Sequence, residues 1–521
     1  MKKYLLAALA VFAFSPAFSQ SVGFRLGKWT EIQNAVIKEL NRSYVDSLPM
    51  DRIYRAGIDA MLESLDPYTI YVPEEDNEDF EFMIGKTYGG IGAIIYKPDT
   101  ESNVVINEPY AGSPAANAGL RCGDEIVTID GKSVKGLKAD EATSRMKGNP
   151  GTTVVFGVKK AFGGDGWAAG DTVEVNIVRQ RIHLPDVEYA GMLNDTTGYI
   201  RLSKFSRNTY TECMNAGKEL LAQGMKHLVF DLRDNTGGYL DEALLLSNMF
   251  LEKGQEIVYM QGLHREKKGF KADGTGILKD VRLTVVINES SASSSEIFAG
   301  AIQDNDRGII VGRRSFGKGL VQEPVYFSDG SGIRLTVARF HTPSGRCIQK
   351  PIGEDYGMDI YKRYSDGEMY DADSIKVDST LAFKTLSGRT VFGGGGIIPD
   401  IFVPVDTTRV TQFFIRIGQK ATQMRYASAI FDKYGDTLSG IDDYAKLEAF
   451  FDRIDLPSDF REYAARTDGI TATQKEWAET EKYLLPQIRG LIGRYSKLGE
   501  NAYYKMYLSV DTTLRKAIGL D

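Results

Sequence analysis

The sequence predicts a multi-domain α+β protein: a helical N-terminal region, a β-rich domain, an α/β core and a mostly helical C-terminal region. Three observations support this prediction. The chain has 521 residues, more than one hydrophobic core usually holds. The hydrophobic period changes along the chain, and in the middle buried apolar runs alternate with helical patterns. We place the segments at 1–19 (a leader), 20–85, 86–180, 181–405 and 406–521.

The composition excludes several classes of protein. The chain is 42% hydrophobic and 26% charged, with a net charge of −7, which disfavours a nucleic-acid binder with a basic stripe. The three cysteines (Cys122, Cys213 and Cys347) do not form a disulfide framework, and we expect them to be small buried hydrophobes. The four histidines are scattered without metal-ligand spacing, so we expect no metal and no cofactor.

The first residues have the pattern of a secretory signal peptide. Lys2 and Lys3 precede the apolar run from Tyr4 to Phe14, and the small residues Ala17 and Ser19 suit cleavage after Ser19. The alternative is a membrane anchor, but the apolar run is shorter than the roughly 20 residues that cross a bilayer. We therefore expect an exported protein, periplasmic or extracellular, with no membrane span in the mature chain.

Hydrophobic periodicity gives the order of elements before the core. Apolar residues at helical spacing over 20–65 predict two packed amphipathic helices. Short runs between glycine and aspartate turns then predict a β-rich domain with one helix over 138–147 and a glycine-rich loop at 161–170. The predicted strands are Ile91–Tyr96, Val104–Ile106, Glu125–Ile129, Thr153–Val158 and Thr172–Val178.

The core alternates strands and helices, which predicts an α/β fold. The strands are Thr197–Leu202, His227–Leu232, Leu283–Asn288, Gly308–Val311, Val321–Phe327 and Ile333–Phe340, and the helices are Thr209–Gln223, Tyr239–Leu251 and Ser294–Gln303. The polar stretch 351–390 is interpreted as a surface excursion. Helical spacing recurs over 406–521, where packing, dimerisation and substrate access stay open as roles.

Three segments of the core carry chemistry. Ser293 lies between a buried strand and a helix, where free backbone N–H groups favour a nucleophile, although Ser293 with Glu296 also fits a plain capping box. Lys318 lies in a glycine-flanked loop and can act as a base only if burial keeps it neutral, which needs roughly 4 to 5 kcal/mol; otherwise it is a solvated lysine. Gly237 and Gly238 follow another buried strand, where their N–H groups suit an oxyanion or simply form a turn.

Together these segments resemble the C-terminal processing peptidases, or tail-specific proteases, which are serine proteases with a Ser/Lys dyad. The matching residues are Ser291 to Ile297, the Phe316-Gly317-Lys318-Gly319 loop and the Asp231 to Gly238 segment. The resemblance implies that Ser293 is the nucleophile and Lys318 the base. It further implies that Gln322 orients the lysine, that Asp304 has an accessory role, and that Gly237 or Gly238 and Ser294 supply the oxyanion N–H groups. An exposed aspartate at a helix end is the simpler interpretation of Asp304.

An upstream set of motifs resembles a PDZ domain. They run from Tyr88-Gly89-Gly90-Ile91-Gly92-Ala93 through Gly123-Asp124-Glu125-Ile126 to Ile129-Asp130-Gly131. In PDZ domains such a loop binds a peptide's terminal carboxylate, which implies this role for Gly90, Ile91, Gly92 and Ala93. The resemblance covers about 25–405. Ser294 stands where the family commonly has Ala, the stretches 161–170 and 351–390 are additions, and 406–521 lie outside the pattern.

The sequence therefore predicts an exported serine endopeptidase that recognises protein or peptide substrates by accessible C-termini through its PDZ domain. A catalytically silent PDZ scaffold or chaperone is the alternative. A Ser-His-Asp hydrolase is disfavoured, because the chain has no GxSxG elbow. Nucleic acid is not an expected partner, the mature chain is expected to have no membrane span, and a homo-oligomer through the terminal helical regions is left open.

Overall fold

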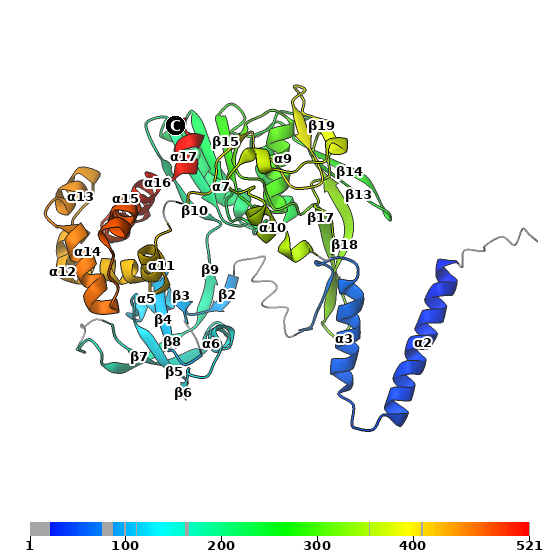
Figure 1. Ribbon diagram of the computed structural model, residues 1–521, viewed down its shortest axis with the longest axis horizontal. Coiled ribbons are helices and arrows are strands. Elements are labelled where there is room, and N and C mark those ends of the chain that lie inside the picture. The colour runs from blue at the N-terminus through cyan, green and yellow to red at the C-terminus, as the bar shows by residue number, and fades with distance from the viewer. Residues whose placement is uncertain are drawn as a thin grey trace, which may run out of the picture. The chain divides into compact units, whose positions relative to one another are not determined.

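The computed structural model describes residues 21–74, 87–97, 100–110, 112–161, 166–353, 355–407 and 410–519 (Figure 1). The chain forms two compact units, residues 1–71 and 72–521. The predicted signal peptide lies outside the described residues. Within the described part of the chain, no helix has both the length and the hydropathy to cross a membrane. The three cysteines are free, with Cys122 and Cys213 buried and Cys347 partly buried.

The first unit contains helices α2 (Val22–Ser43) and α3 (Met50–Glu63) and ends within strand β1 (Ile70–Val72). Both helices occur where the apolar spacing predicts them. Neither helix buries a residue, however, and Trp29 and Val36 are 62% and 52% exposed. The prediction of a packed pair is therefore wrong, because periodicity shows which face is apolar but not what covers it.

The second unit begins with a β-rich domain built around a sheet of order β3-β4-β5-β7-β8, with β6 paired to β5. Strand β2 pairs with β9 in a separate ribbon. The predicted strand at Ile91–Tyr96 starts only at Ala93, because Gly92 has a positive φ of 74°. The elements are β2 (Thr87–Gly90), β3 (Ala93–Tyr96), β4 (Val104–Pro109), α5 (Pro114–Asn117), β5 (Glu125–Ile129), β6 (Lys132–Ser133), α6 (Ala139–Met146), β7 (Thr153–Lys159), β8 (Thr172–Val178) and β9 (Gln180–His183).

The core is a six-stranded sheet of order β10-β11-β12-β15-β16-β21, parallel except for β10. Alternate residues of each strand face opposite sides. On β12, Leu228 and Phe230 pack with helices α7 to α9, whereas Val229 packs with the C-terminal residues Leu508 and Leu514. The elements are β10 (Val187–Met192), β11 (Thr197–Leu202), α7 (Thr209–Ala222), β12 (His227–Asp231), α8 (Leu240–Asn248), β15 (Arg282–Ile287), α9 (Ser294–Asp304), β16 (Ile309–Gly312) and β21 (Ile401–Phe402).

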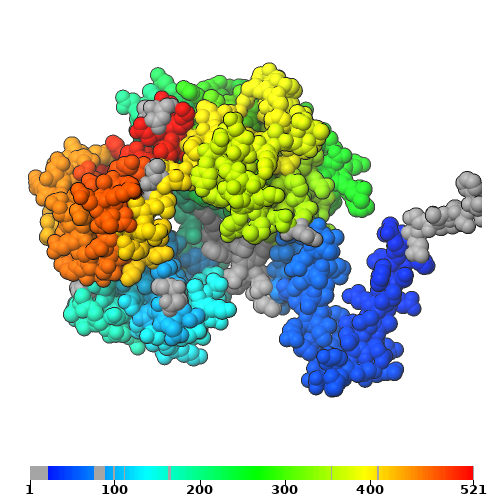
Figure 2. Space-filling model, in the orientation of Figure 1, coloured from blue at the N-terminus to red at the C-terminus, as the bar shows by residue number. Residues whose placement is uncertain are grey.

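A second sheet of the core contains the hairpins β13–β14 and β17–β18. The sequence reasoning did not predict β13 or β14. The 351–390 stretch is more than a surface excursion: it spreads over the core (Figure 2) and buries Arg363, Glu368 and Met369. The elements are β13 (Glu256–Gly262), β14 (Arg265–Lys271), β17 (Leu320–Tyr326), β18 (Gly332–His341), η2 (Tyr356–Met358), α10 (Asp359–Ser365), η3 (Ala372–Ser374), η4 (Ser379–Leu381), β19 (Ala382–Lys384) and β20 (Thr390–Phe392).

The C-terminal region is helical, as predicted, with its own core of Phe413, Tyr426, Phe460, Leu484 and Ile488 among others. Its last two helices return to the core sheet, where Tyr504 stacks on Tyr189 with ring centroids 4.3 Å apart. The helices are α11 (Gln412–Gln419), α12 (Thr422–Ser439), α13 (Tyr444–Phe451), α14 (Leu456–Asp468), α15 (Gln474–Gly493), α16 (Glu500–Leu508) and α17 (Thr512–Ala517).

Candidate active site

Three loops of the core leave the carboxyl ends of adjacent parallel strands. The loop 232–239 follows β12, the loop 288–293 follows β15, and the loop 313–319 follows β16. The carboxyl ends of parallel strands meet at one edge of a sheet, which is where open α/β folds place ligands. The fold thus brings together the three segments that the sequence singled out. We name them, in that order and after the roles that the sequence predicts for them, the oxyanion loop, the nucleophile loop and the base loop.

Ser293 ends the nucleophile loop as the N-cap of α9, with φ 57° and ψ −114°. This conformation is sparsely populated for an L-residue, and such strain persists only where the surroundings enforce it. The Ser293 N–H donates to Glu296 Oε2 at 2.8 Å, so the capping interaction proposed as the plain alternative is present. Capping therefore does not compete with a nucleophilic role, because it uses the backbone of Ser293.

Glu296 links the nucleophile loop to the base loop. Its buried carboxylate accepts from Ser293 N and Lys318 N on one oxygen, at 2.8 and 2.9 Å, and from Ser315 Oγ and Gly317 N on the other, at 2.5 and 2.7 Å. Burial raises the pKa of Glu296 to about 7, although these hydrogen bonds act to lower it. The sequence reasoning recognised Glu296 only as a cap. The hydrogen bonds from Glu296 to the base loop cannot be predicted from the sequence around Glu296.

The partly buried Lys318 lies close to its predicted partner. Lys318 Nζ donates to Gln322 Oε1 at 3.2 Å, and Arg334 Nη2 donates to the same oxygen at 2.8 Å. The flanking glycines allow tight packing, since a Cβ on Gly319 would lie 2.9 Å from the backbone nitrogen of Gln349. Gly317 has φ 90°, which other residues rarely adopt.

The oxyanion loop distinguishes its two glycines. The Gly237 N–H donates to Asn235 Oδ1 at 2.9 Å and is already engaged. The Gly237 carbonyl accepts from Phe205 N, so across a trans peptide the Gly238 N–H points the opposite way. The Gly238 carbonyl accepts from Ser294 Oγ at 2.9 Å, which puts Ser294 on that same side. The geometry favours Gly238 over Gly237 as an oxyanion donor.

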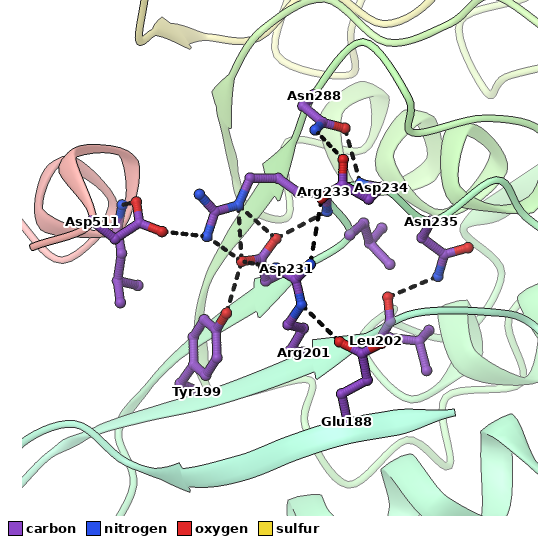
Figure 3. Close-up of polar contacts among 12 residues, drawn as sticks. Glu188, Tyr199, Arg201, Leu202, Asp231, Arg233, Asp234, Asn235, Asn288 and Asp511 are labelled. Atoms are coloured by element: carbon purple, nitrogen blue, oxygen red, sulfur yellow. Dashed lines mark hydrogen bonds and ion pairs between the residues drawn. The ribbon is translucent and has the colours of Figure 1, made fainter. Parts of the chain in front are cut away.

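A polar network fixes the start of the oxyanion loop (Figure 3). Asp231 is fully buried and accepts from Tyr199 Oη at 2.8 Å and from Arg233 Nη2 at 2.6 Å. Burial acts to raise the pKa of Asp231, but the Arg233 guanidinium outweighs it and holds this pKa below its usual value. Arg233 Nη2 also pairs with Asp511 Oδ2 of the C-terminal region at 2.8 Å. Asn288 and Asp234 exchange two hydrogen bonds, which tie this loop to the nucleophile loop.

Asp304 does not join the site. It ends α9, whose 11 residues place it about 16 Å along the helix from Ser293. Its carboxylate pairs with Arg346 at 2.7 Å, and both side chains are fully buried. The interpretation of Asp304 as an exposed helix-end residue is therefore wrong, because Arg346 covers it from a distant part of the chain.

The predicted carboxylate-binding loop joins β2 to β3 in the β-rich domain. Ile91 is buried and its carbonyl accepts from Ala115 N at 2.8 Å, while the Gly92 carbonyl accepts from Tyr110 N at 2.9 Å. The ring of Tyr88 lies over Gly90, where a Cβ would come within 2.6 Å of Tyr88 Cε2. Ala93 then starts β3, which forms one edge of its sheet. The four residues thus form a turn that leads into an edge strand.

Comparisons with known proteins agree with this architecture. Residues 196–358 match the model of peptidase family S41, and residues 105–160 match a PDZ domain model. A probable CtpA-like serine protease of Staphylococcus aureus (strain bovine RF122 / ET3-1) is 34% identical over 360 residues, 68% of this chain and 70% of that protein. A protein of the same description from Staphylococcus haemolyticus is 34% identical over 60% of this chain and 61% of its own length.

Among solved structures, a photosystem II D1 C-terminal processing protease is 28% identical, covering 70% of this chain and 86% of its own, with a TM-score of 0.39. That score is too low to support an argument from superposition. The family assignment rests on the Staphylococcus aureus protein, which is 34% identical over 68% of this chain. The chain belongs to peptidase family S41 and is a serine-type C-terminal processing peptidase with a PDZ domain.

Proposed function

We propose that this protease cleaves peptide bonds with Ser293 as nucleophile and neutral Lys318 as general base. The observation that carries the proposal is the Glu296 carboxylate, which accepts hydrogen bonds from the backbone N–H groups of both residues. One rigid acceptor thereby sets the nucleophile loop and the base loop in register. Such pre-organisation is what a nucleophile and its base require.

The proposed reaction has two stages. Ser293 Oγ attacks the scissile carbonyl carbon while Lys318 Nζ takes its proton, and the N–H groups of Gly238 and Ser294 stabilise the oxyanion. When the C–N bond breaks, Lys318 returns the proton to the leaving amine. Water then attacks the acyl-enzyme, gives a proton to Lys318 and releases the new carboxyl terminus, after which Ser293 regains its proton. Gln322 holds the lysine through its side-chain oxygen.

Replacing either member of the dyad tests this mechanism. Ser293→Ala and Lys318→Ala should each lower cleavage of an unstructured protein by at least about a thousandfold, with unchanged thermal unfolding. Ser290→Ala in the same loop and Lys376→Ala serve as matched controls and should keep full activity, because neither side chain takes part in the proposed reaction. Because only a neutral lysine accepts a proton, wild-type activity should rise toward alkaline pH. Full activity in Ser293→Ala would exclude the assignment.

We further propose that the domain at 86–180 selects substrates by their C-termini, with Gly90, Ile91, Gly92 and Ala93 binding the terminal carboxylate. A turn of backbone N–H groups beside an edge strand supports this role. A fluorescent peptide with a free carboxylate should bind at least tenfold tighter than its amide. Gly92→Ala should remove that preference, since the new Cβ would lie 2.6 Å from Ser113 Cβ. Peptide binding without any cleavage would instead support the scaffold or chaperone.

Export and self-association complete the proposal. Cleavage after Ser19 would release the mature protein, whose domain boundaries lie near residues 85, 180 and 405. Mass spectrometry of the secreted chain tests the cleavage site.

The exposed apolar residues of α2 and α3, such as Phe24 and Trp29, favour a homo-oligomer through the N-terminal region. Light scattering should then show a dimer or larger species that Trp29→Glu dissociates.

A further inference from the structure

The stretch around the end of the family match makes direct contact with the base loop. The match to peptidase family S41 ends at residue 358, and α10 starts at the next position. Arg363 on α10 is only 5% exposed, although arginine is rarely buried without a specific partner. We propose that residues 355–368 clamp the base loop and that Arg363 is a positioning residue for Lys318. This inference rests on the proposed role of Lys318 as the base.

Arg363 holds the base loop by its backbone. Its Nη2 donates to the Arg314 carbonyl at 2.6 Å and its Nη1 to the Ser315 carbonyl at 3.1 Å. A planar guanidinium spans two neighbouring carbonyls, which the single ammonium of a lysine does not reproduce. Ser315 Oγ in turn donates to Glu296. The clamp therefore acts on the same loop that Glu296 joins to Ser293.

Glu368 fixes the orientation of the clamp. Its carboxylate accepts from Arg363 Nε at 2.8 Å and pairs with Arg314 through both oxygens. All three side chains are buried or nearly so, and this arrangement neutralises one of the two guanidinium charges. The carboxylate therefore holds the guanidinium of Arg363 in the plane in which it meets the loop carbonyls.

Two further contacts extend the clamp to both sides of the dyad. Phe316, next to Gly317, packs edge-on against Tyr356, and Lys350 Nζ lies 4.0 and 4.3 Å from the two ring centroids. On the other side, Tyr364 Oη donates to Glu289 at 3.3 Å, at the start of the nucleophile loop. The 355–368 segment therefore touches the loops of both Ser293 and Lys318.

The physical reason for a clamp is the composition of the base loop. Gly317 and Gly319 give it freedom to open, and an open loop would admit water to the lysine and favour its charged form. The charged groups that pack around this loop include Glu296 on α9, Glu289, Arg334 on β18, Lys350 with its partner Asp359, Arg363 and Glu368. Loss of the clamp should thus reduce activity most at neutral pH and least at alkaline pH.

The test is the pH profile of kcat/KM for Arg363→Ala, Arg363→Lys and Tyr364→Phe on one peptide substrate. We expect Arg363→Ala to lose at least tenfold at pH 7, with the profile midpoint moved to higher pH and partial recovery at pH 9. Arg363→Lys should lie between it and wild type, and Tyr364→Phe should lose a few fold. Lys376→Ala removes an exposed ion pair with Asp366 in the same stretch and should stay within twofold.

Several results would overturn the inference. The first is that the pH profiles of Arg363→Ala and Tyr364→Phe match that of wild type. The second is that Arg363→Ala loses kcat/KM equally at every pH, in proportion to its folded fraction. The third is that the profile of Lys376→Ala shifts as far as that of Arg363→Ala. If Arg363→Ala does not fold, Arg363→Lys and Tyr364→Phe decide the question by the same criteria. If Lys318→Ala is inactive and the pH profile of Arg363→Ala is the same as that of wild type, the clamp is refuted and the proposed dyad is not. An active Lys318→Ala refutes the proposed dyad instead.

Discussion

Glu296 gathers four donors from two loops on a single carboxylate. A residue buried this completely would be protonated at neutral pH without them, and burial still raises its pKa to about 7. The ionised form accepts all four hydrogen bonds, whereas the protonated form carries a hydrogen that conflicts with one of the donors. At the scale of the residue, the register of Ser293 and Lys318 therefore depends on the charge of Glu296.

Glu296→Gln tests this dependence. The amide group would face backbone donors, so activity should fall at least tenfold and the free energy of unfolding near pH 8 by roughly 2 kcal/mol. Because the folded pKa is raised from 4.5 to about 7, wild type loses stability as pH rises through that interval, and the variant should lack this slope. Urea unfolding at pH 5, 6 and 8 measures it; parallel slopes would contradict the prediction.

The oxyanion loop shows what an element contributes. Five of its hydrogen-bonding groups meet the nucleophile loop, the first turn of α9 or Leu202: Asp234, Leu232 O, Asn235 O, Asn235 Nδ2 and Gly238 O. These contacts fix the direction of the Gly238 N–H before a substrate arrives. A pre-organised donor of this kind avoids reorganisation during the reaction.

Gly238→Ala should disrupt this element. The new Cβ would lie 2.0 Å from the Phe205 carbonyl oxygen, so the loop must move and kcat should fall at least a hundredfold with little change in KM. Gly224→Ala is the matched control, since Gly224 also has a positive φ but no atom within 4 Å of a Cβ. Steady-state kinetics of both variants measure the effect. Equal kcat values in the two would contradict it.

At the scale of the molecule, the C-terminal region, which the family pattern does not include, reaches the catalytic core. Leu508 and Leu514 pack on the core sheet, and Asp511 between them pairs with Arg233. Arg233 also binds Asp231, at the start of the oxyanion loop. The last helices therefore cover one face of the sheet and supply a charge to the network under the site.

Asp511→Asn should weaken this support without removing it, because Arg233 keeps Asp231 as a partner. We expect kcat to fall about threefold to tenfold, equivalent to roughly 1 kcal/mol, at unchanged KM. Asp442→Asn breaks an exposed pair with Lys446 in the same region and should have no effect. Steady-state kinetics of both variants test this prediction. An unaltered kcat in Asp511→Asn would mean that the C-terminal region contributes only packing to the core.

The sequence predicted those parts of the fold and the site that have local signatures. The order of residues predicted the strand, the glycine turn and the helix around Gly237 and Gly238. It also predicted the helix that Ser293 caps. The reasoning failed where the partner lies far along the chain. Asp304 was expected to be exposed, but Arg346 buries it. The stretch around Arg363 is mostly exposed, as expected, but its contact with the base loop was not predicted.

By itself the sequence determined the family resemblance, the α+β class and the three segments that could carry chemistry, because propensities, periods and motifs act over a few residues. Only the tertiary structure decided that these segments meet at adjacent strand ends and that Glu296 joins two of them. It also showed that the N–H of Gly237 is engaged by Asn235, whereas the N–H of Gly238 points to the side on which Ser294 lies. These properties depend on contacts between residues distant in the chain, and only the folded sheet sets those distances.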